Sequence, residues 1–365
     1  MSELLYRMAI TQIPNVGAVT AKTLIGYCGS AEAVFKSSKK HLLKIPNIGE
    51  ITADTILKSE VIGKAEKEML FAEKNGVQLL SYTDDAYPER LKNRHDAPVI
   101  LYYKGNADLN HGRIISIVGT RQPTPYGVKM CGKIIEELKN YNVTVVSGLA
   151  FGIDIAAHRK CLEVDIPTIA VMGTGLQRIY PSEHRDTAHK MLDNGGLLTE
   201  YFSAQTADRE HFPMRNRIIA GMCDAVAVIE TAAQGGSMIT ATQALNLGKE
   251  TFAVPGRTGD KYSEGCNLLI KKHRVHVLES VEDIAGVLRW EYLDAVKAVQ
   301  PQLFPILSDS ETLIYDTVKQ FESGALIDTI SYITQKGHGE IAGLLLTLEF
   351  KGLIKVLPGK KFMVI

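Results

Sequence analysis

The sequence predicts an α/β protein whose core is a doubly wound, mainly parallel sheet, and two observations support this prediction. First, the apolar run Ile114–Val118 ends at Gly119, and a helical pattern begins after Pro125. A run this short and rich in β-branched residues is typical of a strand buried on both faces of a parallel sheet. Second, similar runs alternate with amphipathic helix patterns from Arg113 onward, which indicates successive βαβ crossovers.

This alternation locates the elements of the core. Strands are expected at Ile114–Val118, Val143–Val146, Thr168–Met172, Leu197–Thr199, Ala225–Ile229, Thr251–Val254 and Val275–Leu278. Helices are expected between them, at Tyr126–Asn140, Ile153–Glu163, Glu183–Asn194, Asn216–Met222 and Ser237–Leu247. An earlier strand-like run, Ala97–Gly105, is expected to extend the same sheet, and we assign residues 81–290 to the core.

Length and composition limit the remaining possibilities. At 365 residues the chain exceeds one comfortable core, so two or three domains are expected. The formal net charge is zero, so a nucleic-acid partner would have to be held by a local basic cluster. The five cysteines have no paired spacing, which argues for a reducing compartment and against a zinc site. With no signal peptide and no membrane-spanning run, we expect a cytoplasmic protein with no membrane partner, metal or cofactor.

Residues 1–80 contain an internal repeat and are expected to form a helical domain. The segments Ile13–Gly17 and Ile45–Gly49 both read Ile-Pro-Asn-x-Gly, and both resemble the helix-hairpin-helix motif. Turn amides at Gly17 and Gly49 can meet a DNA phosphate without reading its sequence, and Lys22 follows the first turn. A helical domain used only for packing explains the same pattern, and both interpretations stay open.

The last part of the chain is expected to be a separate domain. Residues 291–307 have two prolines and no periodicity, and are interpreted as a linker. Residues 308–365 show three helical patterns, at Glu311–Phe321, Leu326–Ile333 and Gly339–Lys351, followed by a hairpin with Pro358-Gly359 at its tip. This order predicts a winged helix. Its third helix is apolar and carries little positive charge, which favours packing or partner docking over reading of the DNA major groove.

Polar and glycine-rich residues gather where the predicted core strands end. Ligands of open α/β sheets bind at the carboxyl ends of the strands, so this convergence predicts a binding cleft. The first strand ends in Gly119, Thr120 and Arg121, of which Arg121 adds a fixed positive charge. The other strand ends supply Ser147-Gly148, Gly173-Thr-Gly175, Glu200, Glu230 with Gly235-Gly236-Ser237, and Pro255-Gly-Arg257.

The densest candidate cluster is Arg215, Asn216 and Arg217, at the expected start of a helix. Two arginines beside an amide suit phosphodiester oxygens, although ion pairing with surface carboxylates is their commoner fate. The stretch Gly235–Ser237 begins another helix, whose amides and serine hydroxyl can cap an anion or simply cap the helix.

Three acids and a histidine are candidate catalytic groups. Asp154 and His158 are spaced to bond each other on one helix, and a structural contact is the favoured interpretation. Glu200 and Glu230 lie near the predicted cleft, where acids beside arginines more often orient them than catalyse. No serine–histidine–acid order, metal-spaced cluster or Walker lysine stands out, so no enzyme is predicted.

Short motifs spread over nearly the whole chain resemble the DNA-processing protein A (DprA/Smf) family. Each is short, but their order and joint presence are specific. The matching stretches are Tyr87-Pro88, Pro98–Gly105, Val118–Arg121 with Tyr126-Gly127, Val146–Ala150 with Gly152–Asp154 and His158, Tyr180-Pro181, Phe212–Ile219, Gly236-Ser237 with Thr240-Ala241, Pro255-Gly256, and Gly265 with Asn267, Leu269 and Ile270.

The resemblance implies an extended Rossmann-like core, preceded by the helical domain and followed by the winged helix. It implies binding of incoming single-stranded DNA during natural transformation, protection of that strand, and loading of the RecA recombinase. The family's basic pocket maps onto Arg121 and Arg215–Arg217. Ser182 stands where some members carry a lysine.

The resemblance also implies a homodimer that associates through the last part of the core. The residues concerned here are Leu268, Leu269, Ile270, Val275 and Val277. The charged stretch Lys271–Arg274 replaces the small residues usual in the family.

Two other interpretations use the same cleft. The core resembles nucleotide phosphoribohydrolases of the lysine-decarboxylase-like group, but their Pro-Gly-Gly-x-Gly-Thr signature is replaced by Ala233-Gln-Gly-Gly-Ser-Met. A sensor of a small nucleotide ligand is the other alternative. Release of free base from a nucleotide would favour the enzyme, whereas salt-sensitive binding to oligonucleotides would favour the family function.

Overall fold

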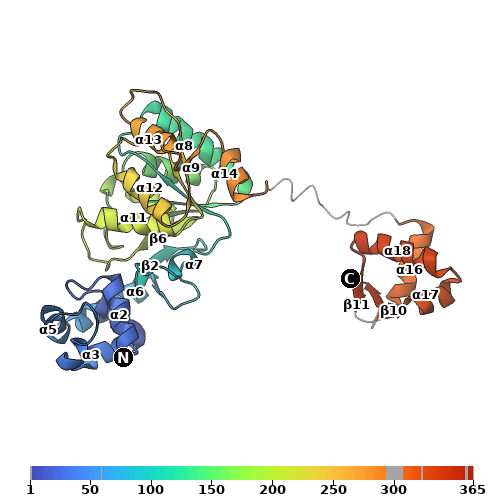
Figure 1. The fold of residues 1–365 in the computed structure, drawn as a ribbon, viewed down its shortest axis with the longest axis horizontal. Coiled ribbons are helices and arrows are strands. Elements are labelled where there is room, and N and C mark those ends of the chain that lie inside the picture. Colours follow the sequence, from blue (N-terminus) through green and yellow to red (C-terminus); the bar gives the residue numbers. More distant parts are fainter. Residues whose placement is uncertain (1, 59, 293–306, 322–323, 358–360, 365) are drawn as a thin grey trace. The chain divides into compact units, whose positions relative to one another are not determined.

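The structure is a computed structural model that describes residues 2–58, 60–292, 307–321, 324–357 and 361–364. The chain divides into two compact units, Met1–Leu293 and Asp294–Ile365 (Figure 1). The first unit holds the N-terminal helices and the large sheet, and the second holds the C-terminal helices and a small sheet. Of the expected linker 291–307, residues 293–306 lie outside the described residues.

The N-terminal helices contain the repeat that the sequence predicts. The turns before α2 and α5 each place an asparagine in the left-handed region, Asn15 at φ 64° and Asn47 at φ 63°. Asparagine tolerates this conformation, which explains why both copies carry it at the same point. The bounds are α1 Glu3–Ile10, α2 Ala18–Cys28, α3 Ala31–Lys36, α4 Lys39–Leu42, α5 Glu50–Lys58 and α6 Val61–Asn75.

A nine-stranded sheet forms the core of the first unit, in the order β1-β2-β6-β5-β4-β3-β7-β8-β9. The pairs β1–β2 and β2–β6 are antiparallel, and the pairs from β6 through β9 are parallel. This topology confirms the prediction of a mainly parallel sheet. The strands are β1 Gln78–Ser81, β2 Ile100–Gly105, β3 Ile114–Val118, β4 Thr144–Ser147, β5 Thr168–Val171, β6 Gly195–Thr199, β7 Ala225–Val228, β8 Glu250–Ala253 and β9 His276–Val277.

Helices cover both faces of this sheet, so the core is doubly wound as predicted. One face packs against apolar side chains of α7, α11, α12 and α13, and the other against those of α8, α9 and α14 (Figure 1). The bounds are α7 Glu89–Lys92, α8 Pro125–Leu138, α9 Ile153–Glu163, α10 Arg185–Lys190, α11 His211–Gly221, α12 Gly236–Asn246, α13 Glu264–Lys271 and α14 Val281–Leu288, with short 3-10 turns at Lys139–Tyr141 and Ser182–His184.

Several element boundaries differ from the predictions. Helix α11 begins at His211, five residues before the expected start at Asn216. The expected helix Glu183–Asn194 is a 3-10 turn followed by the shorter α10. Strand β1 starts at Gln78, so the sheet begins just inside the segment assigned to the helical domain. Within the described residues the last strand keeps only His276 and Val277 in the ladder, where they pair with β8.

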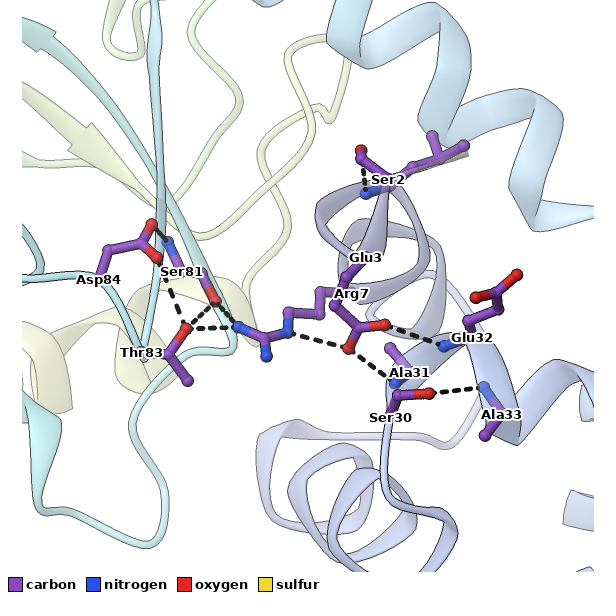
Figure 2. A network of polar contacts seen from close by, with 11 residues as sticks. Ser2, Glu3, Arg7, Ser30, Ala31, Glu32, Ala33, Ser81, Thr83 and Asp84 are labelled. Carbon is purple, nitrogen blue, oxygen red and sulfur yellow. Dashed lines mark hydrogen bonds and ion pairs between the residues drawn. The ribbon is translucent and has the colours of Figure 1, made fainter.

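The N-terminal helices are attached to the sheet by polar contacts. The guanidinium of Arg7 donates to the hydroxyls of Ser81 (2.7 Å) and Thr83 (2.5 Å), while Glu3 accepts from the amides that begin α3 (Figure 2). On α6, the buried carboxylate of Glu68 accepts both the amide and the hydroxyl of Ser203, at 2.7 and 2.8 Å. The helices therefore pack on the core through specific bonds.

The second unit has its own apolar core. Helices α16 Asp309–Lys319, α17 Ile327–Thr334 and α18 His338–Phe350 pack with an antiparallel sheet in the order β10-β12-β11. The strands are β10 Ala325–Leu326, β11 Ile354–Leu357 and β12 Lys361–Val364, and the expected turn at Pro358-Gly359 lies outside the described residues. This order fits the winged helix, which stays a prediction. None of the described helices of the chain is long and apolar enough to cross a membrane.

Candidate functional site

An open cavity of about 630 Å³ lies at the carboxyl end of β3. Its walls come from the loop after β3, the first turns of α9, α11 and α12, and the loop around Tyr262. Strand β3 lies between β4 and β7 in the middle of the parallel sheet, so several strand ends meet there. This is the position at which the sequence predicts a cleft.

Eight of the predicted cleft residues line this cavity. They come from the β3 loop, from α11 and from the start of α12. They are Gly119, Thr120, Arg121, Arg215, Asn216, Gly235, Gly236 and Ser237. The other three, Ser147, Gly148 and Arg217, do not line it.

Arg217 points away from the cavity. One guanidinium nitrogen donates to the Asp96 carbonyl at 2.6 Å, and another pairs with the carboxylate of Glu200. The reason is helical geometry, because residues two positions apart on a helix lie about 200° apart, so Arg215 and Arg217 cannot face the same ligand. Ion pairing, the alternative to a phosphate contact, is therefore what the structure has at Arg217, and Glu200 orients this arginine as expected.

Arg215 lines the floor of the cavity and is almost wholly buried. The residue is only 3% exposed, and its Nη1 donates to the carbonyls of Gly148 (2.6 Å) and Val171. Burial lowers the pKa of Arg215 to about 10, and nearby Asp154 opposes this shift. The guanidinium thus ties the ends of β4 and β5 together. Ser147 is likewise buried, and its hydroxyl donates to the Ile117 carbonyl at 2.6 Å.

The exposed positive charges at the cavity are Arg121 and Arg209. The guanidinium carbon of Arg121 lies 5.5 Å from the centre of the Phe212 ring, and that ring packs against Tyr180 with centroids 5.7 Å apart. Neither arginine forms an ion pair within the described residues, and both side chains are exposed. A cation over an aromatic ring is attracted by the quadrupole of the ring, so the contact with Phe212 stabilises the position of the Arg121 side chain at the rim.

The sequence interpretation missed Arg209, Tyr180 and Phe212 as site residues. It places Phe212 in the segment before a helix, whereas α11 already begins at His211 and so carries the ring into the cavity. Had the sequence interpretation begun this helix at His211 and not at Asn216, it would have placed Phe212 on the helix. Tyr180 belongs to a distant loop whose approach to Phe212 is visible only in the folded chain.

The N-terminus of α12 opens into the cavity. Its N-cap residue, Gly235, offers no side-chain cap, so the first amides of the helix lack that partner. The hydroxyl of Ser237 is buried and has no hydrogen-bond partner among the described residues, although the residue lines the cavity. Helix N-termini attract anions through free amides and the helix dipole. An unpartnered buried hydroxyl at the same point adds a donor.

Glu230 holds the β3 loop in shape. Its carboxylate accepts from the amide of Thr124 at 2.8 Å and from the same residue's hydroxyl, and it fills the space beside Gly127. Glu230 was expected to orient an arginine, and it orients Thr124 instead. Gly152 supports the loop from below at φ 82°, where a Cβ would collide with the Thr120 carbonyl. This is a position that only glycine fits.

The expected contact between Asp154 and His158 is wrong. His158 instead bonds the hydroxyl of Thr168 at 2.7 Å, and burial lowers its pKa to about 3. Asp154 accepts the amide of Ala150 at 3.4 Å and faces the cavity. Burial raises the pKa of Asp154, against the opposing charge of Arg215.

The candidate contacts of the helical domain lie away from the cavity. Gly17 and Gly49 are exposed at their turns. Lys22, in contrast, is half-buried against the core, where its Nζ donates to the Arg94 carbonyl at 3.0 Å and lies 5.0 Å from the Tyr82 ring centre. Burial lowers the pKa of Lys22. Its ammonium therefore already has protein partners.

The predicted self-association residues lie at one edge of the sheet. Leu269 is buried, while Leu268, Ile270 and Val275 are half-buried and Val277 is 41% exposed on β9. The basic residues Lys271–Arg274 beside them are all exposed. Ser182 lies in the short 3-10 turn, where its hydroxyl contacts Glu183 at 3.1 Å.

The fold and the cavity define an extended Rossmann-like α/β protein with a helix-hairpin-helix domain attached. Residues 78–289 match the family model described as DNA recombination-mediator protein A, and residues 8–59 match a SAM-like helix-hairpin-helix tandem. The chain belongs to the DNA recombination-mediator protein A family.

Similar proteins of known sequence agree with this membership. The chain is 42% identical to the DNA processing protein DprA of Streptococcus pneumoniae, over 53% of this chain and 68% of the relative. It is 30% identical to the protein Smf of Synechocystis, over 99% of this chain and 98% of that protein.

Solved structures resemble the fold, and two of them are DNA processing proteins. The X-ray structure of DNA processing protein A from S. pneumoniae covers 80% of this chain and 99% of its own, with a TM-score of 0.67 and 30% identity. A structure of DNA processing protein A from Helicobacter pylori, described as giving insight into a unique single-stranded DNA binding mode, covers 59% of this chain and 97% of its own. Its TM-score is 0.54, at 27% identity.

Proposed function

We propose that this protein binds single-stranded DNA in the cavity at the end of β3. The observation that supports this most is the rim, where Arg121 and Arg209 are exposed and unpaired within the described residues, beside the rings of Phe212 and Tyr180. Proteins that bind single strands combine positive charges for the backbone with aromatic rings on which bases stack. The open N-terminus of α12 and the Ser237 hydroxyl supply further phosphate donors.

The shape of the site favours a single strand over a duplex. The aromatic rings lie at the rim of the cavity, where Tyr180 is 51% exposed. An unpaired base can stack on them, whereas the stacked and paired bases of a duplex offer no free face. The similarity to the H. pylori protein, whose structure concerns single-stranded DNA binding, supports the same choice.

The family membership supports a role for this binding. We propose that the protein receives the strand taken up in natural transformation, protects it, and loads the RecA recombinase onto it. We propose that it does so as a homodimer in the cytoplasm. The names of its relatives, DNA processing proteins, and the description of its family as a recombination mediator support this role.

The test is a binding assay that compares single-stranded with double-stranded oligonucleotides of one length at two salt concentrations. We expect tighter binding to the single strand and a marked loss of affinity at the higher salt. Equal affinity for both forms would contradict the proposal. A parallel incubation with nucleotide monophosphates tests the alternative functions, because release of free base would indicate a phosphoribohydrolase and tight binding without reaction would indicate a nucleotide sensor.

A further inference from the structure

The floor of the cavity has a different chemistry from its rim. Asp154 lies at the floor, only 8% exposed, and forms no ion pair within the described residues. The Ala150 amide donates to it at a long 3.4 Å, and the nearby Ser147 hydroxyl donates to the Ile117 carbonyl at 2.6 Å. An ionised carboxylate has about four acceptor sites. Asp154 therefore keeps unused acceptor capacity inside the cavity.

Donors lie beside this acceptor. The guanidinium of Arg215 uses Nη1 and Nε within the protein, and no acceptor meets its Nη2 among the described residues. Asn216 lines the cavity and accepts from Arg215 through its carbonyl oxygen at 3.2 Å, which leaves its amide nitrogen to donate. A phosphate group offers only acceptors, whereas the edge of a nucleobase offers donors and acceptors side by side. The floor of the cavity offers an acceptor and donors side by side, which is the pattern that complements the edge of a nucleobase.

The anion-binding features lie at the other side of the cavity. Ser237 and the amides of α12 follow β7, whereas Asp154 follows β4, and β3 lies between these strands. Two inter-strand spacings, about 10 Å, separate the ends of β4 and β7. A nucleotide can span such a cavity with its phosphate at α12 and its base edge at the floor. The reverse orientation would bring a phosphate against the Asp154 carboxylate.

We propose that the cavity takes one base of the strand edge-first onto Asp154, which accepts its exocyclic amine, and that the site therefore prefers cytosine to thymine. This inference rests on the proposed single-strand binding. Cytosine carries an amine, a donor, where thymine carries a carbonyl oxygen, an acceptor that the carboxylate repels. Thymine also carries a C5 methyl group, which stays the same when the wild-type protein and a variant at Asp154 are compared. The change in the ratio between the two proteins therefore isolates this contact.

A simpler role for Asp154 predicts different behaviour. If the carboxylate only balances the charges of Arg121 and Arg215, its loss changes the binding of every strand in the same proportion. If it accepts a base donor, its loss changes the order of preference between bases. The distinction lies in the ratio of affinities, which a general loss of positioning or stability does not alter.

The experiment compares short oligonucleotides of equal length, dC, dT and a fully abasic strand, at one salt concentration. For the wild-type protein we expect dC to bind about fivefold more tightly than dT, the value of one modest base contact, and the abasic strand to bind most weakly. Asp154→Asn should bring the dC to dT ratio close to one, because an amide can also donate to thymine. Glu210→Gln removes a charge from an exposed residue just before α11 and should leave the ratio unchanged.

Each other outcome has a defined meaning. Equal wild-type affinity for dC and dT, or for dC and the abasic strand, overturns the inference without any variant. An Asp154→Asn protein that keeps the wild-type ratio overturns it as well. If the wild-type protein binds none of the three strands, the proposed single-strand binding itself is wrong, which the measurement distinguishes from a missing base preference.

Discussion

The guanidinium of Arg121 lies over the ring of Phe212, 5.5 Å from its centre, and makes no ion pair in the described part of the chain. Arg217 lies five residues further along α11 than Phe212 and, unlike Arg121, forms an ion pair, with Glu200. The two arginines therefore have separate functions. Arg121 is available to a ligand, whereas Arg217 belongs to the internal structure of the core.

Replacing Arg121 by alanine should weaken binding of single strands of every base sequence. A phosphate contact contributes through released counterions, so the slope of log affinity against log salt should fall by about 0.7. Titrations at several salt concentrations measure this slope. Arg121→Lys, which keeps the charge, is the control and should keep most of the slope. An alanine variant with the wild-type slope would show that Arg121 meets no phosphate.

Arg217→Ala should act on stability instead. The substitution leaves the buried Glu200 carboxylate without its partner, and breaking such a pair costs about 3 kcal/mol. We expect a lower midpoint of urea denaturation and, for the fraction that stays folded, an unchanged salt slope of binding. A stable variant with a reduced salt slope would assign Arg217 to the DNA site after all.

The contrast between these arginines shows what sequence patterns resolve. The strand-and-helix alternation and the Ile-Pro-Asn-x-Gly repeat depend on local chemistry, so the sheet, the edge at which the cavity lies and the tandem turns were predictable. The direction of each side chain depends on where a helix begins. With the start of α11 set at Asn216, Arg215 and Arg217 looked equivalent, and Phe212 and Arg209 looked like loop residues. Partners such as Asp96 are distant in sequence and leave no local signal.

The burial of the Glu68 carboxyl should make stability depend on pH, although its hydrogen bonds from Ser203 oppose the shift of its pKa. Burial raises the pKa of Glu68 in the folded protein, so the folded chain holds a proton that the unfolded chain releases at a lower pH. The free energy of unfolding should therefore fall as pH rises from the ordinary glutamate value through the raised one. Glu68→Gln removes this titration and should flatten the profile.

Urea denaturation over a pH series measures the effect as a difference between wild type and variant, in which other titrating groups cancel. Glu66→Gln, at an exposed position on the same helix, is the matched control and should reproduce the wild-type profile. If the Glu68→Gln profile has the wild-type slope, burial does not perturb this carboxyl.

Ending the chain near Pro301 should leave a folded protein that binds single strands. All residues of the cavity belong to the compact unit Met1–Leu293, which has its own core. A cooperative thermal transition and near wild-type affinity for short strands are the expected results. Aggregation of the truncated protein would mean that the C-terminal unit completes the core.

Self-association should govern the affinity for long strands. One cavity that holds a few phosphates binds modestly at physiological salt, because each contact is screened. In a dimer, the second cavity binds the same long strand intramolecularly, which raises the apparent affinity. The candidate surface is the edge of the sheet at β9, where Val277 is 41% exposed and where β9 pairs with β8 alone among the described strands.

We expect the wild-type protein to sediment as a dimer and Val277→Asp to sediment as a monomer. Val277 suits this test better than Ile270, whose half-buried side chain packs against the core, so that a charge there would also affect folding. The Val277→Asp variant should lose affinity for long strands and keep it for strands that reach one cavity only. An Arg289→Asp control changes charge at an exposed residue after α14 and should remain dimeric. A wild-type protein that is monomeric at micromolar concentration would contradict the dimer itself. A Val277→Asp variant that stays dimeric would show that the interface does not include β9.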